Sequence, residues 1–386
     1  MSQPRVRRPG ISESLQPAHQ QNYTVRKSLQ VERVSVQAMG GTGLRLATHY
    51  LAASLLDGLQ PSVLHLDSDH GETFATRIPG GEWVQLSPSQ QVRFGVDDPR
   101  AELRKRPEMQ RRYQRLLHGI PVSQTYRRGA AQARPYGLIQ YDLSIGAVRA
   151  ALNADFDRFY PSFQGRGRDG RGRGMGDVLA HQQAQAQAEQ PLLMVYAGSG
   201  VGGQGSAVFG AHAYVARHEL AKRNARNVTH IGILLGPKAF AGRESQLDTN
   251  YAATLRELEA MYCDGFDFVF SDGERVSSDK PPFDQLFLVD LPEWPEGERN
   301  NDRLSDTAMD DWLRRVAYSA RLYTQRTMHD RAQSLLANIP PDPQATLTFG
   351  ALSAALVHAN VDAMIETAAL TAARDALIGL AARCQA

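Results

Sequence analysis

Residues 197–206 read Ala197-Gly198-Ser199-Gly200-Val201-Gly202-Gly203-Gln204-Gly205-Ser206, after the apolar run 192–196 and before a helical pattern over 207–223. We call this stretch the second glycine turn. The first glycine turn, Gly40-Gly41-Thr42-Gly43, also follows an apolar run and precedes a helical pattern, over 44–56. Glycine lets backbone N–H groups approach a phosphate, and the start of a helix adds partial positive charge. Two such turns predict one nucleotide bound from two sides.

The composition is that of a soluble globular protein. The 386 residues are 42% hydrophobic and 22% charged, and the formal net charge is only +2, which argues against nucleic acid as a partner. The two cysteines, Cys263 and Cys384, lie far apart without metal-ligand spacing, which favours a reducing cytoplasm. The sequence has no apolar run long enough to span a bilayer, and its basic N-terminal residues are not followed by a signal-peptide core.

Apolar runs and helical patterns alternate along most of the chain. This alternation predicts an α/β fold with a doubly wound, mostly parallel sheet that helices cover on both faces. The predicted strands are residues 31–38, 63–66, 192–196, 231–235 and 283–290. Further expectations are a charged helical region over 95–118, helices over 143–159 and 250–262, a hairpin around Asp272-Gly273 over 266–278, and one long or two broken helices over 306–336.

The domain organisation follows from changes in composition. We expect a nucleotide-binding domain over 29–330, after a disordered or extended arm at 1–28 and before a short helical segment at 331–386. A flexible Arg/Gly-rich insert is expected at about 163–190. Arg-Gly repeats can bind RNA, but the tract lacks interleaved aromatic residues, which favours a surface loop.

Two standard phosphate-binding motifs match the second glycine turn only in part. The P-loop motif requires a lysine after its last glycine, and Gln204 follows Gly203 instead. The dinucleotide motif Gly-x-Gly-x-x-Gly matches Gly198, Gly200 and Gly203, but the next strand, 231–235, does not end in an acidic residue. A P-loop NTPase is therefore disfavoured.

The first glycine turn departs from the dinucleotide motif in the opposite way. Asp67 and Asp69 follow the next strand and are well placed to bind a ribose, but Leu46 stands where Gly or Ala is required. An NAD-dependent oxidoreductase remains an alternative hypothesis. If the glycines served only to form tight turns, that would explain one of the two glycine clusters. It would poorly explain residues 197–206, a ten-residue stretch of mostly glycine and serine.

Gly202-Gly203-Gln204-Gly205-Ser206 resembles the Gly-Gly-Gly-Thr-Gly-Ser-Gly signature of the tubulin/FtsZ superfamily. Over residues 31–330 the other segments follow in the order of that family, and residues 248–253 and 281–284 are similar to a divergent bacterial tubulin-like group. The first glycine turn corresponds to the first phosphate loop of the family, and Asp67-Ser68-Asp69 corresponds to its acidic second loop. Arg134-Pro135-Tyr136-Gly137 corresponds to the third loop, and residues 236–242 correspond to the Lys-Pro-Phe segment. Residues 287–290 correspond to the strand beside the base, and residues 306–326 correspond to the central helix.

The resemblance implies a cytoplasmic, cytoskeletal-type protein that binds GTP or GDP and self-associates head to tail or polymerises. It places Mg²⁺ on the β and γ phosphate oxygens, and no separate protein metal site is predicted. Because a carboxylate can accept from the N1 and N2 donors of guanine, an acid near the start of the central helix could hold the base. The implied nucleotide-binding residues are Gly40, Gly41, Thr42, Gly43, Asp67, Asp69, Gly200, Gly202, Gly203, Gln204, Gly205, Ser206, Asp290, Asp306 and Asp310.

The resemblance also implies a catalytic pair after the central helix, Asp330 and Gln333, which would enter the nucleotide site of the next subunit. Orienting the attacking water calls for two acids, and a glutamine can position water but cannot accept its proton. Hydrolysis is therefore expected to be weak or assembly-dependent. The alternative hypothesis is a nucleotide-sensing scaffold that does not hydrolyse GTP and acts through a partner protein.

Overall fold

The computed structural model has two compact units, residues 1–352 and 353–386, and every described residue belongs to the first. The arm predicted at 1–28, most of the Arg/Gly-rich insert and most of the segment 331–386 lie outside the described residues. The structure describes residues 30–78, 82–96, 98–116, 130, 133–160, 189–241, 247–291, 299–300, 303–325, 329 and 349–351.

A seven-stranded sheet forms the centre of the described part of the chain. Its strand order is β13-β10-β7-β6-β1-β2-β5, and every neighbouring pair is parallel. The prediction of a doubly wound, mostly parallel sheet is thus confirmed. The strands are β1 (Gln30–Met39), β2 (Leu59–Asp67), β5 (Gln91–Arg93), β6 (Leu192–Ser199), β7 (Val228–Leu235), β10 (Gln285–Val289) and β13 (Phe349–Ala351).

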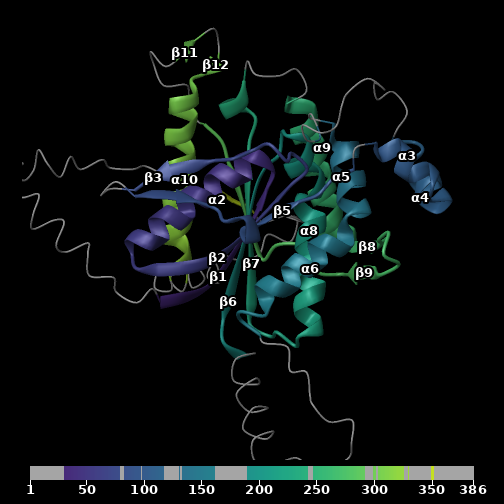
Figure 1. Ribbon diagram of the computed structural model, residues 1–386, viewed down its shortest axis with the longest axis horizontal. Helices are drawn as coiled ribbons and strands as arrows, with labels where there is room; N and C mark the ends of the chain where they lie inside the picture. The colour runs from purple at the N-terminus through teal and green to yellow at the C-terminus, as the bar shows by residue number, and fades with distance from the viewer. Residues whose placement is uncertain are drawn as a thin grey trace, which may run out of the picture. The chain divides into compact units, whose positions relative to one another are not determined.

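Helices cover both faces of the sheet (Figure 1). Alternate residues of each central strand point to opposite faces, which explains the continuous apolar runs. In β6, Met194 and Tyr196 join one hydrophobic core, whereas Val195 and Ala197 join the other. The first core is covered by α5 (Arg134–Leu143), α6 (Ile145–Phe156), α8 (Gly203–Lys222) and α9 (Leu247–Asp264), and the second by α2 (Gly40–Leu56) and α10 (Asp306–Thr324).

The chain changes direction across the sheet between β1 and β6. From β1 it proceeds to β2 and β5 on one side, and from β6 it proceeds to β7, β10 and β13 on the other. In open α/β sheets such a switch point leaves a crevice at the carboxyl ends of the two strands, where ligands bind. The glycine turns follow these two neighbouring strands.

Smaller elements surround the sheet. The charged region predicted over 95–118 forms two short helices, α3 (Pro99–Arg104) and α4 (Pro107–Tyr113), because Pro107 cannot continue the first of them. The hairpin predicted around Asp272-Gly273 is confirmed as β8 (Phe266–Val269) and β9 (Arg275–Ser278), and Gly273 has a φ of +83°. The remaining short elements are β3 (Ala75–Arg77), β4 (Trp83–Gln85), η1 (Pro88–Gln90), η2 (Lys238–Phe240), β11 (Arg299–Asn300) and β12 (Arg303–Leu304).

Two predicted segments differ from the structure. The segment 134–137, expected as a loop before a helix, is itself the first turn of α5. Residues 349–351, within a segment expected to be helical, form β13 and extend the sheet beside β10. Among the described helices, none is long and apolar enough to cross a membrane.

Candidate functional site

The two glycine turns meet at the switch point of the sheet. Met39 at the end of β1 lies opposite Gly198 in β6, so both turns leave the same edge. Gly40 has a φ of +71°, and a Cβ built on it would lie 3.4 Å from the backbone nitrogen of Gly205. A Cβ on Gly43 would lie 2.9 Å from the carbonyl oxygen of Ala197. Only glycine permits this approach of backbone to backbone, so the two turns form one cradle.

The first glycine turn is the first turn of α2. No side chain caps the start of this helix, and its first turn contains no acidic residue of its own. The carboxylate of Glu72, from the loop after β2, lies against Gly41 at the place that a Cβ would occupy. Burial, and then the charge of Asp69, raises the pKa of Glu72. An anionic group of the protein therefore lies at a helix start that attracts anions.

The second glycine turn leads into α8, which begins without a side-chain cap at Gly202. Asn250 of α9 donates to the carbonyl of Val201 at 2.9 Å, and Arg134 of α5 donates to the carbonyl of Ser206 at 3.1 Å. These contacts bind carbonyl oxygens of the turn. They fix the turn from two helices without using the N–H groups at the start of α8, which remain suited to a phosphate.

Buried polar atoms that lack a hydrogen-bond partner among the described residues gather at this edge. Gln204 is 5% exposed, and its amide nitrogen and oxygen both lack a hydrogen-bond partner. The same is true of the amide of Gln140 in α5, which is fully buried. Ser68 Oγ and His65 Nδ1 are unpartnered as well. An unsatisfied buried polar group costs about 1–3 kcal/mol, so several in one place point to a polar ligand.

Three acids, Asp67, Asp69 and Glu72, lie at the end of β2 and in the loop that follows, beside the first glycine turn. Asp67 is 3% exposed, and its Oδ1 accepts from the backbone N–H of Asp69 at 3.1 Å. Burial, opposed by that hydrogen bond and reinforced by the charges of Glu72 and Asp69, raises the pKa of Asp67 to about 7. His65 lies 3.8 Å from Asp67, but its own pKa is lowered by burial to about 4, so it gives no compensating charge at neutral pH. The loop therefore gathers acids whose ionised form a bound cation would stabilise.

The acids expected near the base are held by other contacts. Asp290, just after β10, accepts from the backbone N–H groups of Lys238 and Leu291 at 3.0 and 2.9 Å. Asp310 of α10 lies 3.0 Å from Nε2 of His49, a buried residue of α2. Because His49 is nine residues along α2 from Gly40, that contact is about 13 Å from the first glycine turn. Asp306 is exposed in the first turn of α10.

A family model described as tubulin-like matches residues 40–377. The chain belongs to the tubulin-like family. The match begins at the first glycine turn and includes every element of the sheet from β2 onward. No curated protein matches this chain. The tubulin-like fold therefore agrees with the strand order and with the place of the two glycine turns.

Part of the expected tubulin-like site is beyond the described residues. Asp330 and Gln333, the expected catalytic pair, both fall there, after α10 in the sequence. Within the described part, the residues that lie together at the switch point are Gly40, Gly41, Thr42, Gly43, Asp67, Asp69, Gly200, Gly202, Gly203, Gln204, Gly205 and Ser206. Asp290 and Asp310 are engaged with other parts of the chain instead.

Sequence reasoning missed Glu72 and Gln140. Glu72 had a signal, since it is the third acid within residues 67–72, and the loop places its carboxylate against Gly41. Gln140 had none, because a glutamine within a helix does not differ in sequence from a surface residue. Its position at the site depends on α5 packing so closely on α8 that a Cβ on Gly137 would lie 2.5 Å from the carbonyl of Gly203.

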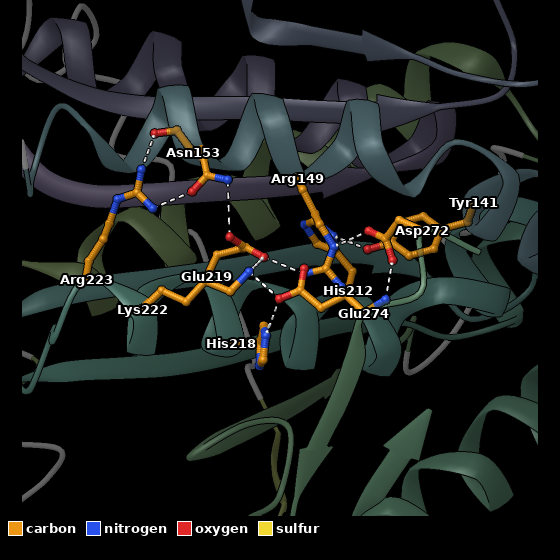
Figure 2. Close-up of polar contacts among 10 residues, drawn as sticks. All are labelled: Tyr141, Arg149, Asn153, His212, His218, Glu219, Lys222, Arg223, Asp272 and Glu274. Carbon is orange, nitrogen blue, oxygen red and sulfur yellow. Dashed lines mark hydrogen bonds and ion pairs between the residues drawn. The ribbon is translucent and has the colours of Figure 1, made fainter. Parts of the chain in front are cut away.

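A second polar cluster lies away from this edge, between α6, α8 and the β8–β9 hairpin (Figure 2). His218, Glu219 and Glu274 offer ligand atoms within 4.8 Å of one another, which is a geometry that could bind a metal. Two cations already occupy this place, because Lys222 and Arg149 each contact both glutamates. We therefore interpret it as a structural ion network. We call it the hairpin cluster: Arg149, His218, Glu219, Lys222, Asp272 and Glu274.

Glu274→Gln should make the chain less stable at pH 7 but not in acid. Although burial opposes the shift, hydrogen bonds from Lys222 and His218 and the charge of Arg149 lower the pKa of Glu274 to about 2. The charged carboxylate thus stabilises the fold fully above pH 4.5, the ordinary pKa of a glutamate, and the stabilisation is lost as the pH falls toward 2. Urea unfolding should show a deficit of about 1.5–3 kcal/mol at pH 7 that shrinks at pH 3.5.

The matched control for this prediction is Glu259→Gln, which removes an exposed acid of α9 for which the described structure gives no ion pair. It should leave the free energy of unfolding nearly unchanged at both pH values. An equal deficit for Glu274→Gln at pH 7 and pH 3.5 would contradict the electrostatic explanation and indicate a packing effect.

Proposed function

We propose that the chain binds GTP or GDP at the switch point and self-associates as a cytoplasmic, cytoskeletal-type protein with weak or assembly-dependent hydrolysis. The observation that carries the proposal is the close approach of the two glycine turns, in which a Cβ built on Gly40 would lie 3.4 Å from the backbone nitrogen of Gly205. A phosphate chain in the cradle would contact N–H groups of both turns. Membership of the tubulin-like family supports the same site.

The residues present fit a nucleotide phosphate chain. Both α2 and α8 begin without side-chain caps, so their first N–H groups can donate to phosphate oxygens. The amide of Gln204, in the second glycine turn, is buried and lacks a partner in the described structure. We propose that its nitrogen donates to a phosphate oxygen. The Glu72 carboxylate next to Gly41 supports the proposal that an acidic group can lie at the first turn of α2.

The acidic loop after β2 fits a divalent cation. Carboxylates of Asp67, Asp69 and Glu72 next to bound phosphates would repel them, and burial already raises the pKa of Asp67 and Glu72. Carboxylate and phosphate oxygens are the ligands that Mg²⁺ prefers. We propose that one or more of these acids hold Mg²⁺, directly or through water. When bound, the ion would offset the negative charge that develops in phosphoryl transfer.

Competition binding tests the nucleotide. With Mg²⁺ present, we expect GTP and GDP to displace a fluorescent guanine nucleotide at least tenfold more effectively than ATP or NAD. The reason is that Asp306 is an exposed carboxylate that can accept from N1 and N2 of guanine, whereas adenine offers no such pair of donors. Asp306→Ala should reduce the preference for guanine and leave the affinity for inorganic triphosphate unchanged.

Two outcomes would contradict this assignment. Tighter binding of ATP would place base recognition on residues other than Asp306. Tight binding of NAD would support the alternative of an oxidoreductase, in which Asp67 or Asp69 binds a ribose.

Hydrolysis is expected to require contact between subunits. The central helix α10 has 19 residues and is therefore about 28 Å long, and Asp330 follows its end in sequence. A head-to-tail neighbour could bring Asp330 to the nucleotide, and such contacts propagate into filaments. GTP turnover per subunit should rise with protein concentration. Asp330→Ala should abolish turnover and leave nucleotide affinity unchanged.

A turnover rate per subunit that does not change with concentration would argue for catalysis within one chain. Absence of turnover at every concentration, with nucleotide binding intact, would favour a scaffold that senses the nucleotide and acts through a partner protein. That alternative is supported by Gln333, which stands where a second acid is expected and cannot accept a proton from water.

A further inference from the structure

Cationic side chains gather on α3, α4 and the turn that follows to Leu116. Residues 98–116 contain seven cationic and three acidic side chains, whereas the whole chain carries a net charge of only +2. The charge is therefore local, and the net charge of the chain conceals it. We call this part of the surface the arginine face.

The inner side of the two helices is packed firmly against α5. Leu103, Met109 and Tyr113 are buried and form a hydrophobic cluster with Ile139. The hydroxyl of Tyr113 donates to Asp142 at 2.7 Å. Because this side is used for packing, the opposite side of α3 and α4 must face solvent, and its charges are held on a fixed support.

One arginine of the segment serves to attach it to the β8–β9 hairpin. Arg112 donates to the carbonyl of Val269 at 2.5 Å and lies over the ring of Phe268, with its guanidinium carbon 4.7 Å from the ring centre. It also lies 3.5 Å from the buried carboxylate of Asp142. Arg112 is thus already engaged, so the binding surface is formed by the other cations.

Arg106, Arg111 and Arg115 are exposed, and none makes an ion pair with a carboxylate of the described residues. The acids of α3 are engaged with other cations, since Asp98 lies 3.9 Å from Arg104 and Glu102 lies 2.6 Å from Lys105. The third acid, Glu108 of α4, is exposed and makes no ion pair within the described residues, and the sequence from Met109 to Tyr141 contains no acidic residue.

The chemistry of the arginine face fits phosphate groups better than other anions. Six of the seven cations are arginines, whose planar guanidinium groups bind phosphate through two parallel hydrogen bonds. The only aromatic residue of the segment, Tyr113, is buried. The face therefore offers no ring on which unpaired bases could stack, and no aromatic anchor for a membrane interface.

We propose that the arginine face binds the phosphate backbone of duplex DNA without sequence preference. The contact is electrostatic, because backbone phosphates are recognised by cations and carry no sequence information. The inference rests on the helices α3 and α4 and is independent of nucleotide binding at the switch point. It replaces the expectation from net charge alone that nucleic acid is not a partner.

Fluorescence polarisation with a labelled random duplex of about 30 base pairs tests the proposal, since such a duplex carries a phosphate charge about every 1.7 Å of its axis. We expect the logarithm of the association constant to fall linearly with the logarithm of the salt concentration between about 50 and 200 mM. The triple variant Arg106→Gln, Arg111→Gln, Arg115→Gln should weaken binding at least about tenfold and lower the salt slope by roughly 3, one per lost phosphate contact.

The matched control removes three cations elsewhere, Arg226→Gln, Arg256→Gln and Lys280→Gln, which are exposed residues that make no ion pair with described carboxylates. It changes the net charge equally and should leave affinity and slope unchanged. Circular dichroism must show both triple variants folded. Equal weakening by the two variants, absence of binding at 50 mM salt, or tighter binding to anionic lipid vesicles or single strands would overturn the proposal.

Discussion

Arg149→Ala is expected to lower the free energy of unfolding by about 3 kcal/mol or more. Arg149 is 8% exposed, contacts the buried Glu219, and lies 2.8 Å from Asp272 and 3.2 Å from Glu274. Its removal leaves Glu219, which is 2% exposed, with Lys222 as its only cation in the hairpin cluster. A buried carboxylate that loses a partner keeps its cost of desolvation, so the loss exceeds that of a surface pair.

The control lies in the same hairpin. Arg275 pairs with Asp267 at 2.5 Å, but both side chains are more than half exposed, so Arg275→Ala should leave stability nearly unchanged. Urea unfolding of both variants at pH 7 provides the comparison. A double variant, Arg149→Met with Glu219→Gln, should recover part of the loss because it removes both charges. Equal losses for Arg149→Ala and Arg275→Ala would contradict the assignment of the hairpin cluster as a buried network.

The sheet was predictable because its central strands are buried on both faces. A strand such as β6 then requires apolar residues at nearly every position, and Leu192–Tyr196 stand out from their polar surroundings. The short edge strand β13 was not predictable. Among the described residues its pairing with β10 involves just Phe349–Ala351, and an alanine-rich context favours a helix when judged by local propensity.

The starts of α2 and α8 were predicted four residues too late. Glycine is a poor helix former, so the patterns suggested helices from Leu44 and Ala207, whereas the helices begin at Gly40 and Gly203. Tertiary contacts override propensity here, because the turns pack backbone against backbone at the switch point. This difference matters for function, since it places the glycines in the first helical turns, where N–H groups are free of helical partners.

The candidate site was predictable to the extent that it is local in sequence. Both glycine turns and the acids after β2 are short motifs at strand ends, and parallel strands bring their carboxyl ends to one edge. The partners of Asp310 were not predictable, because His49 belongs to a helix 261 residues away in sequence. The hairpin cluster likewise joins residues of three elements that no local pattern connects.

Gly205→Ala is expected to weaken nucleotide binding by at least about tenfold, or roughly 1.4 kcal/mol. A Cβ on Gly205 would lie 3.0 Å from the carbonyl oxygen of Ser199 and 3.2 Å from that of Met39. Both neighbours are backbone atoms at the ends of β6 and β1, which cannot move aside as a flexible side chain would. The two turns must therefore separate, and the cradle for the phosphates widens. Titration with a fluorescent guanine nucleotide measures the effect.

Two further variants separate binding from folding. Gly146→Ala adds a Cβ into open space on α6 and should leave affinity unchanged. Gln204→Leu removes a buried amide that lacks a partner among the described residues, so the nucleotide-free chain should become more stable and bind nucleotide more weakly. These opposite shifts distinguish a ligand-binding amide from a structural one. If Gln204→Leu were stabilising with unchanged affinity, and folded Gly205→Ala bound nucleotide normally, the phosphates would have to be placed away from the glycine turns.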